Sequence, residues 1–73
     1  MAEMPVRSEV AGVVLRVAVA AGARIAEGDE VAIVEAMKME LPVLSPAAGT
    51  VRAVLVKAGD QVAEGQALAM LSR

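Results

Sequence analysis

An internal repeat constrains this chain more than any other feature. Residues 3–36 align without a gap on residues 40–73, with 15 identities in 34 pairs. Three pairs of glycines stay in register, which an abundance of Ala and Val would not by itself produce: Gly12 with Gly49, Gly22 with Gly59, and Gly28 with Gly65. Such a repeat indicates one supersecondary unit used twice. Two copies are too few for a solenoid, so we expect a closed two-fold arrangement in a single domain spanning residues 1–73.

Each copy carries a strand-and-turn pattern, because short runs of Val, Ile and Leu alternate with glycine-containing segments. We therefore predict an all-β fold with four strands in each copy. The expected strands are residues 5–9, 12–19, 24–26, 31–36, 39–44, 49–56, 61–63 and 67–72. The turn glycines are expected to serve the backbone alone, since Gly takes positive φ without steric cost.

Residues 35–41 pose a conflict, because they are mostly good helix formers. Pro42 opposes a helix by restricting Leu41 to extended conformations, and the flanking segments are strand-like. We predict a hairpin with the tight turn Ala36-Met37-Lys38-Met39. Favoured two-residue turns need positive φ at both central residues, for which Met37 and Lys38 are poor choices. This mismatch indicates a function at Lys38, and the two-fold relation places it at the opposite end from both chain termini.

Composition excludes several classes of function. With 73 residues there is no room for an enclosed substrate pocket, and without aromatic residues the core must consist of aliphatic side chains and Met. The absence of Cys and His disfavours a metal site. The net charge of −2 is dispersed without a basic cluster, which disfavours nucleic acid. Neither an apolar run of about 20 residues nor a signal pattern is present, so we expect a cytoplasmic protein without a membrane partner.

An exposed lysine at a hairpin tip can be a solvated charge, a catalytic nucleophile or a site of covalent modification. A Schiff-base lysine needs burial or a neighbouring cation to become neutral, whereas Glu35 and Glu40 favour the charged form. Covalent modification suits a protruding amine on a rigid hairpin that another enzyme can reach. The chemistry at Lys38 is therefore predicted to be modification, with no catalytic residue in the chain.

A family resemblance is carried by the string VEAMKME at residues 34–40, with Gly28 ten residues before the lysine and AGTV at residues 48–51. It resembles the biotinyl domain of biotin carboxyl carrier proteins, which is related to lipoyl domains, over nearly the whole chain. The resemblance implies a flattened eight-stranded barrel of two four-stranded antiparallel sheets with quasi-two-fold symmetry. It also implies that a biotin protein ligase attaches biotin to Lys38.

The same resemblance implies a non-catalytic carrier subunit of a biotin-dependent carboxylase or decarboxylase. Its other partners would be a biotin carboxylase, which carboxylates the ureido nitrogen, and a carboxyltransferase, which passes the carboxyl group to an acceptor. Ala36, Met37 and Met39 are expected to be read at the tip, and Glu35 and Glu40 to flank the recognition surface. Met could equally serve as a structural gap-filler. Lys57, the only other lysine, is expected to stay unmodified.

Some relatives carry an insertion called the thumb, but only Ala20–Ala23 separate Val19 from Arg24 here, so no thumb fits. With few residues before Val6, a free-standing carrier or a trimmed domain is expected. Three alternatives remain. The first is a lipoyl carrier for oxidative acyl transfer, against which the paired methionines argue. The second is an unmodified lipoyl-like docking module. An enzyme with Lys38 as nucleophile comes last.

Overall fold

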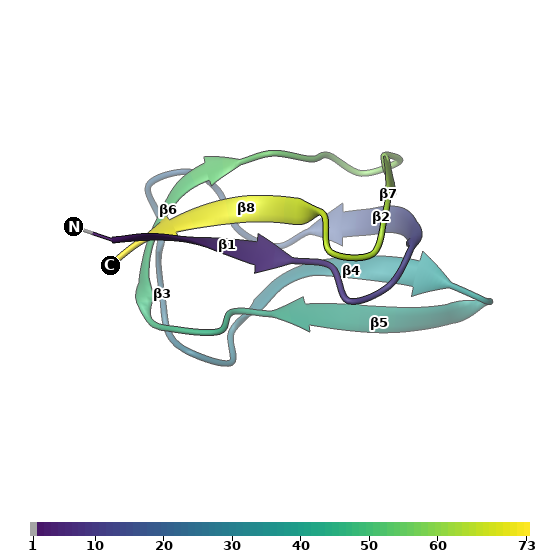
Figure 1. The fold of residues 1–73 in the computed structure, drawn as a ribbon, viewed down its shortest axis with the longest axis horizontal. Helices are drawn as coiled ribbons and strands as arrows, with labels where there is room; N and C mark the ends of the chain where they lie inside the picture. Colours follow the sequence, from purple (N-terminus) through teal and green to yellow (C-terminus); the bar gives the residue numbers. More distant parts are fainter. Residues whose placement is uncertain (1) are drawn as a thin grey trace.

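The protein folds into two four-stranded antiparallel sheets, as seen in a computed structural model that describes residues 2–73 (Figure 1). The predicted all-β class with eight strands is confirmed. The strands are β1 (Glu3–Arg7), β2 (Gly12–Val17), β3 (Arg24–Ile25), β4 (Glu30–Ala36), β5 (Met39–Leu44), β6 (Gly49–Val54), β7 (Gln61–Val62) and β8 (Ala67–Ser72). Among these residues no helix is long and apolar enough to cross a membrane.

The strand order relates the two sheets by the 37-residue shift. One sheet runs β1-β8-β6-β3 and the other β5-β4-β2-β7, so each strand is replaced by its counterpart from the other half of the chain. Register follows the same rule: Glu3 lies opposite Ser72 in one sheet, and Glu40 lies opposite Glu35 in the other. Each sheet contains strands from both halves of the chain, since β1 pairs with β8 in one sheet and β4 pairs with β5 in the other.

The core consists of small aliphatic side chains from both sheets. Its most deeply buried members come from the longer strands β1, β2, β4, β6 and β8 and include Val6, Val14, Val31, Val34, Val51, Leu68 and Leu71. Side chains of this size let the sheets approach closely in the absence of aromatic residues. Two buried serines close the connections after β1 and β5: the Ser8 hydroxyl donates to the Val10 carbonyl and the Ser45 hydroxyl to the Ala47 carbonyl, each at 2.6 Å.

Several predicted strand boundaries were wrong by about two residues. The first strand was expected at 5–9 but occupies Glu3–Arg7, because the Ser8 hydrogen bond bends the chain after Arg7. The strands expected at 12–19 and 49–56 end at Val17 and Val54. After both points the chain leaves one sheet to reach a strand of the other, β3 or β7, so the regular ladder cannot continue.

The long axis of the molecule separates the β4–β5 hairpin from the chain ends (Figure 1). At the far end the Arg73 amide donates to the Ala2 carbonyl at 3.0 Å. Under the repeat these two residues are the counterparts of Ala36 and Met39, which flank the hairpin turn. The prediction that the hairpin and the ends lie at opposite poles is therefore confirmed for residues 2–73, and Met1 lies outside the described residues.

Proline residues in two edge strands disfavour pairing of these edges with other chains. Pro5 lies in β1 and Pro42 in β5, each at the free edge of its sheet. Because Ala36 and Met39 flank a two-residue turn, Pro42 falls opposite Ile33 at a position where its nitrogen faces away from β4. Proline there removes a donor that another chain could use, without loss of a ladder bond.

Candidate functional site

The β4–β5 turn is a two-residue turn closed by the Ala36–Met39 pair. Its central residues have φ of 52° for Met37 and 66° for Lys38, the only positive values among the described non-glycine residues. Both therefore occupy the left-handed region that the mirror-image hairpin turns require. The predicted hairpin is confirmed, and the helix favoured by propensity alone does not form. Each of these conformations costs about 1–2 kcal/mol for a side chain other than Gly.

The tip exposes apolar side chains together with the lysine. Lys38 is exposed, Met37 has 95% of its surface exposed and Met39 has 61%. Met37 therefore covers no part of the core, and a role as a structural gap-filler does not describe it. Ala36, half-buried at the last position of β4, anchors the turn. The turn therefore presents the lysine amine between two exposed methionine side chains to an approaching macromolecule.

Two carboxylates face each other below the turn. Glu35 on β4 pairs directly with Glu40 on β5, and both are exposed. Like charges placed opposite each other destabilise a strand pair. The salt bridges of the described residues lie elsewhere, between Arg16 and Glu30 and between Arg52 and Glu3 at 2.8 Å. The hairpin thus keeps an unfavourable pair of negative charges next to Lys38.

Gly12, the first residue of β2, packs closely against the backbone of β4 near the hairpin turn. A Cβ atom at this position would lie 2.3 Å from the Glu35 carbonyl oxygen and 2.9 Å from a Val34 methyl group. Only glycine lets β2 approach β4 this closely. The repeat counterpart Gly49 has the same relation to the Ser72 carbonyl, at 2.7 Å, near the chain ends.

A hollow of about 360 Å³ adjoins the tip. The hairpin contributes Ala36, Met37, Met39 and Leu41; the connection after β1 contributes Glu9, Val10 and Ala11, and the turn before β8 contributes Glu64. Sequence reasoning missed these last four residues, because they lie far from Lys38 along the chain. One signal was present: at positions 9 and 10 the copies differ (Glu and Val against Pro and Ala), between matched serines and matched Ala-Gly pairs.

Comparisons with known proteins agree with this geometry. The family model Biotin_lipoyl, described as "Biotin-requiring enzyme", matches residues 4–71. No curated protein matches the chain. Two solved carboxylases are similar: the urea carboxylase of Kluyveromyces lactis, with 33% identity and a TM-score of 0.92 over 99% of this chain, and a single-chain, multi-domain long-chain acyl-CoA carboxylase, with 35% identity and a TM-score of 0.90 over 97%.

The chain spans only 6% and 7% of the length of these two carboxylases. It is also similar to the lipoyl domain of the 2-oxoglutarate dehydrogenase complex of Azotobacter vinelandii, over 96% of this chain and 91% of that domain. That likeness, with a TM-score of 0.72 at 24% identity, concerns the fold alone.

Proposed function

Because this chain belongs to the family of biotin- and lipoyl-attachment domains, we propose that it is a biotin carrier in which Lys38 holds biotin through an amide bond. The observation that carries the proposal is the tip itself: an exposed Met-Lys-Met turn in a left-handed conformation that its residue types disfavour. A chain that needed only a stable turn would be served better by Asn or Gly. The strain is understandable if the side chains of the turn are read by a modifying enzyme.

Biotin rather than lipoate is the proposed group. The methionines on both sides of Lys38 resemble biotin attachment sites, as the sequence indicated. The similarity to the urea carboxylase and the acyl-CoA carboxylase, at 33% and 35% identity, supports this choice further. When bound, biotin supplies a ureido nitrogen that can accept and release a carboxyl group. Ala36, Met37 and Met39 would form the surface that the ligase reads, with Glu35 and Glu40 at its margin.

The role of the protein is to present and transport the cofactor. The proposed partners are a biotin protein ligase, a biotin carboxylase and a carboxyltransferase. A rigid two-sheet body with its attachment site at one pole lets each partner enclose the tip without meeting the rest of the chain (Figure 1). Tethering raises the effective concentration of the cofactor at each docked partner. Docking must be brief, because the same tip has to visit successive active sites.

The decisive test is the intact mass of the protein purified from its native host, followed by peptide mapping of Lys38 and Lys57. A biotin adduct confined to Lys38 is the expected result. Lys38→Arg should abolish the adduct and keep the melting temperature, because the exposed side chain contributes no packing. A lipoyl adduct would replace biotin carriage by oxidative acyl transfer, and an unmodified Lys38 in cells with active ligases would favour the docking module.

A further inference from the structure

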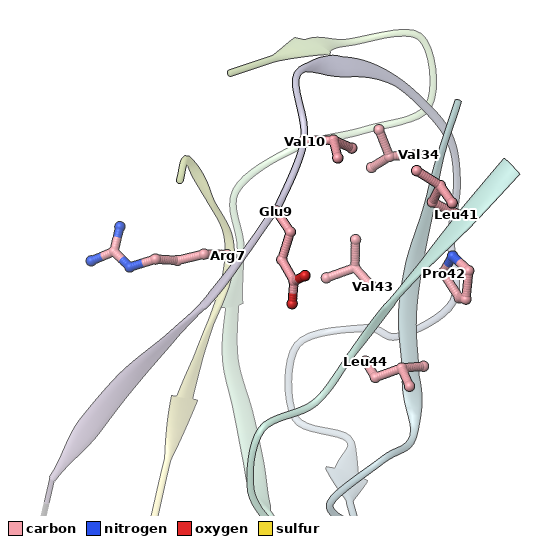
Figure 2. A pocket seen from close by; sticks show the side chains of 8 residues that line it. All are labelled: Arg7, Glu9, Val10, Val34, Leu41, Pro42, Val43 and Leu44. Carbon is pink, nitrogen blue, oxygen red and sulfur yellow. The ribbon is translucent and has the colours of Figure 1, made fainter. Parts of the chain in front are cut away.

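A second hollow continues the first along β5. Its volume is about 270 Å³, and it is lined by Arg7, Glu9, Val10, Val34, Leu41, Pro42, Val43 and Leu44 (Figure 2). Glu9, Val10 and Leu41 line both hollows. Together the two form one groove, which we call the β5 groove, from the hairpin tip to Leu44. An apolar groove that begins beside the attachment site is suited to hold what is attached there.

The second hollow combines an apolar wall with one carboxylate. Its apolar lining includes Val10, Val34, Leu41 and Val43, and the Glu9 side chain extends beside Val43 (Figure 2). Arg7 points away from this space and donates to the Gly65 carbonyl at 2.8 Å. Glu9, in contrast, has no hydrogen-bond or salt-bridge partner among residues 2–73. The charged acceptor facing the hollow is therefore Glu9.

This chemistry matches biotin and not lipoate. The bicyclic ring of biotin has an apolar thioether half and a ureido half with two N–H donors. The apolar wall can pack against the thioether half. A carboxylate can accept hydrogen bonds from the ureido N–H groups, and its negative charge strengthens these bonds. The dithiolane ring of lipoate has no N–H donor for Glu9. On the proposed function above, we infer that the β5 groove is an intramolecular resting site for the biotin ring, with Glu9 as its hydrogen-bond acceptor.

The distance is within reach of the arm. From Met39, two residues of strand cover about 7 Å to Leu41, and four residues cover about 13 Å to Val43. An extended biotinyl-lysine arm has about eleven bonds between the Lys38 Cα and the ring, which span about 13 Å, so the ring begins beside Leu41 and its far edge extends toward Val43. The aliphatic arm would cross the first hollow, against Ala36 and Met39, and the ring would lie against Leu41 and Val43. In this position the aliphatic arm would pack against the exposed Met39 side chain and cover it.

Methyl NMR spectra of the protein with and without biotin on Lys38 test this directly. The expected result is shifts at Val10, Leu41, Val43 and Leu44, and nuclear Overhauser contacts between these methyl groups and the ring. Shifts confined to residues 36–40 would overturn the resting site while leaving biotin carriage intact. If mass spectrometry finds no biotin on Lys38, the proposed function fails first, so the two failures are distinguishable.

Capture by streptavidin at physiological salt gives a second readout, because only the extended cofactor can be captured. If half to nine-tenths of the rings are retracted, Glu9→Ala should speed capture by about two- to tenfold. Leu44→Ala should act in the same direction, since Leu44 closes the far end of the groove. Glu27→Ala is the control, because it removes the same charge from an exposed turn outside the groove. Equal capture rates for all loaded forms would contradict the inference.

Discussion

At the scale of single residues, Met37 and Lys38 occupy a backbone conformation suited to Asn and Gly. Met37 buries nothing, with 95% of its surface exposed, so its replacement removes no packing. Met37→Asn should therefore stabilise the protein by about 0.5–1 kcal/mol, because Asn tolerates the left-handed region better. That corresponds to a rise in melting temperature of roughly 2–8 °C.

The same Met37→Asn substitution should slow biotinylation, if the ligase reads the methionine. Met39→Asn is the matched control, since Met39 lies in β5 with extended geometry and Asn disfavours strands. It should leave the melting temperature unchanged or lower it. Thermal unfolding followed by circular dichroism measures the first effect and intact mass against time the second. A Met37→Asn protein that melts lower than the native chain would contradict the argument from strain.

The Glu35–Glu40 pair yields a second residue-scale prediction. Glu40→Lys turns a repulsive cross-strand pair into an attractive one, and should stabilise the hairpin by about 0.2–1 kcal/mol. If the two carboxylates serve recognition, the same change should slow loading of Lys38 by the ligase. Melting temperature and biotinylation rate would then move in opposite senses. Unchanged biotinylation kinetics in the Glu40→Lys protein would show that the charge pair is not read.

At the scale of elements, the hairpin depends on how closely β2 approaches β4. Gly12→Ala would place a Cβ 2.3 Å from the Glu35 carbonyl oxygen, so the strands must separate next to the turn. Overpacking of this kind costs about 1–3 kcal/mol. We expect a lower melting temperature together with slower biotinylation, because the turn loses its support.

Gly49→Ala is the control for Gly12→Ala. It forces a Cβ to 2.7 Å from the Ser72 carbonyl oxygen, at the opposite pole of the molecule. It should lower the melting temperature while leaving the initial rate of biotinylation unchanged below the transition. A Gly12→Ala protein that is loaded as fast as the Gly49→Ala protein would mean that the ligase does not need the hairpin in its native position.

At the scale of the whole molecule, most strand pairings join one half of the chain to the other. Within residues 3–36 only β2 and β4 pair, and within residues 40–73 only β6 and β8. Peptides covering residues 2–37 and 38–73 should each be unfolded when isolated, because a two-stranded unit is marginally stable at best. Amide dispersion in NMR spectra checks this, and a cooperative thermal transition in either peptide alone would contradict it.

The sequence by itself was enough to predict the class of fold, the eight strands and the hairpin around Lys38. The repeat and the glycine-punctuated Val runs are local signals, and Pro42 excluded the competing helix. Strand ends were less predictable. The strands β2 and β6 end where the chain crosses to the other sheet. The residue types at 18–19 and 55–56 do not indicate this crossing point.

The sequence alone also determined the residue types at the tip, because the Met-Lys-Met string and its flanking carboxylates are contiguous. Only the tertiary structure brought Glu9 and Val10 alongside Leu41 and placed Glu64 next to the tip. The reason is physical: these contacts arise from packing of the two sheets and from pairings across the repeat, which join residues far apart in the chain. Periodicity specifies which face of a strand is buried, whereas the neighbours that meet across a groove are decided by how the sheets close.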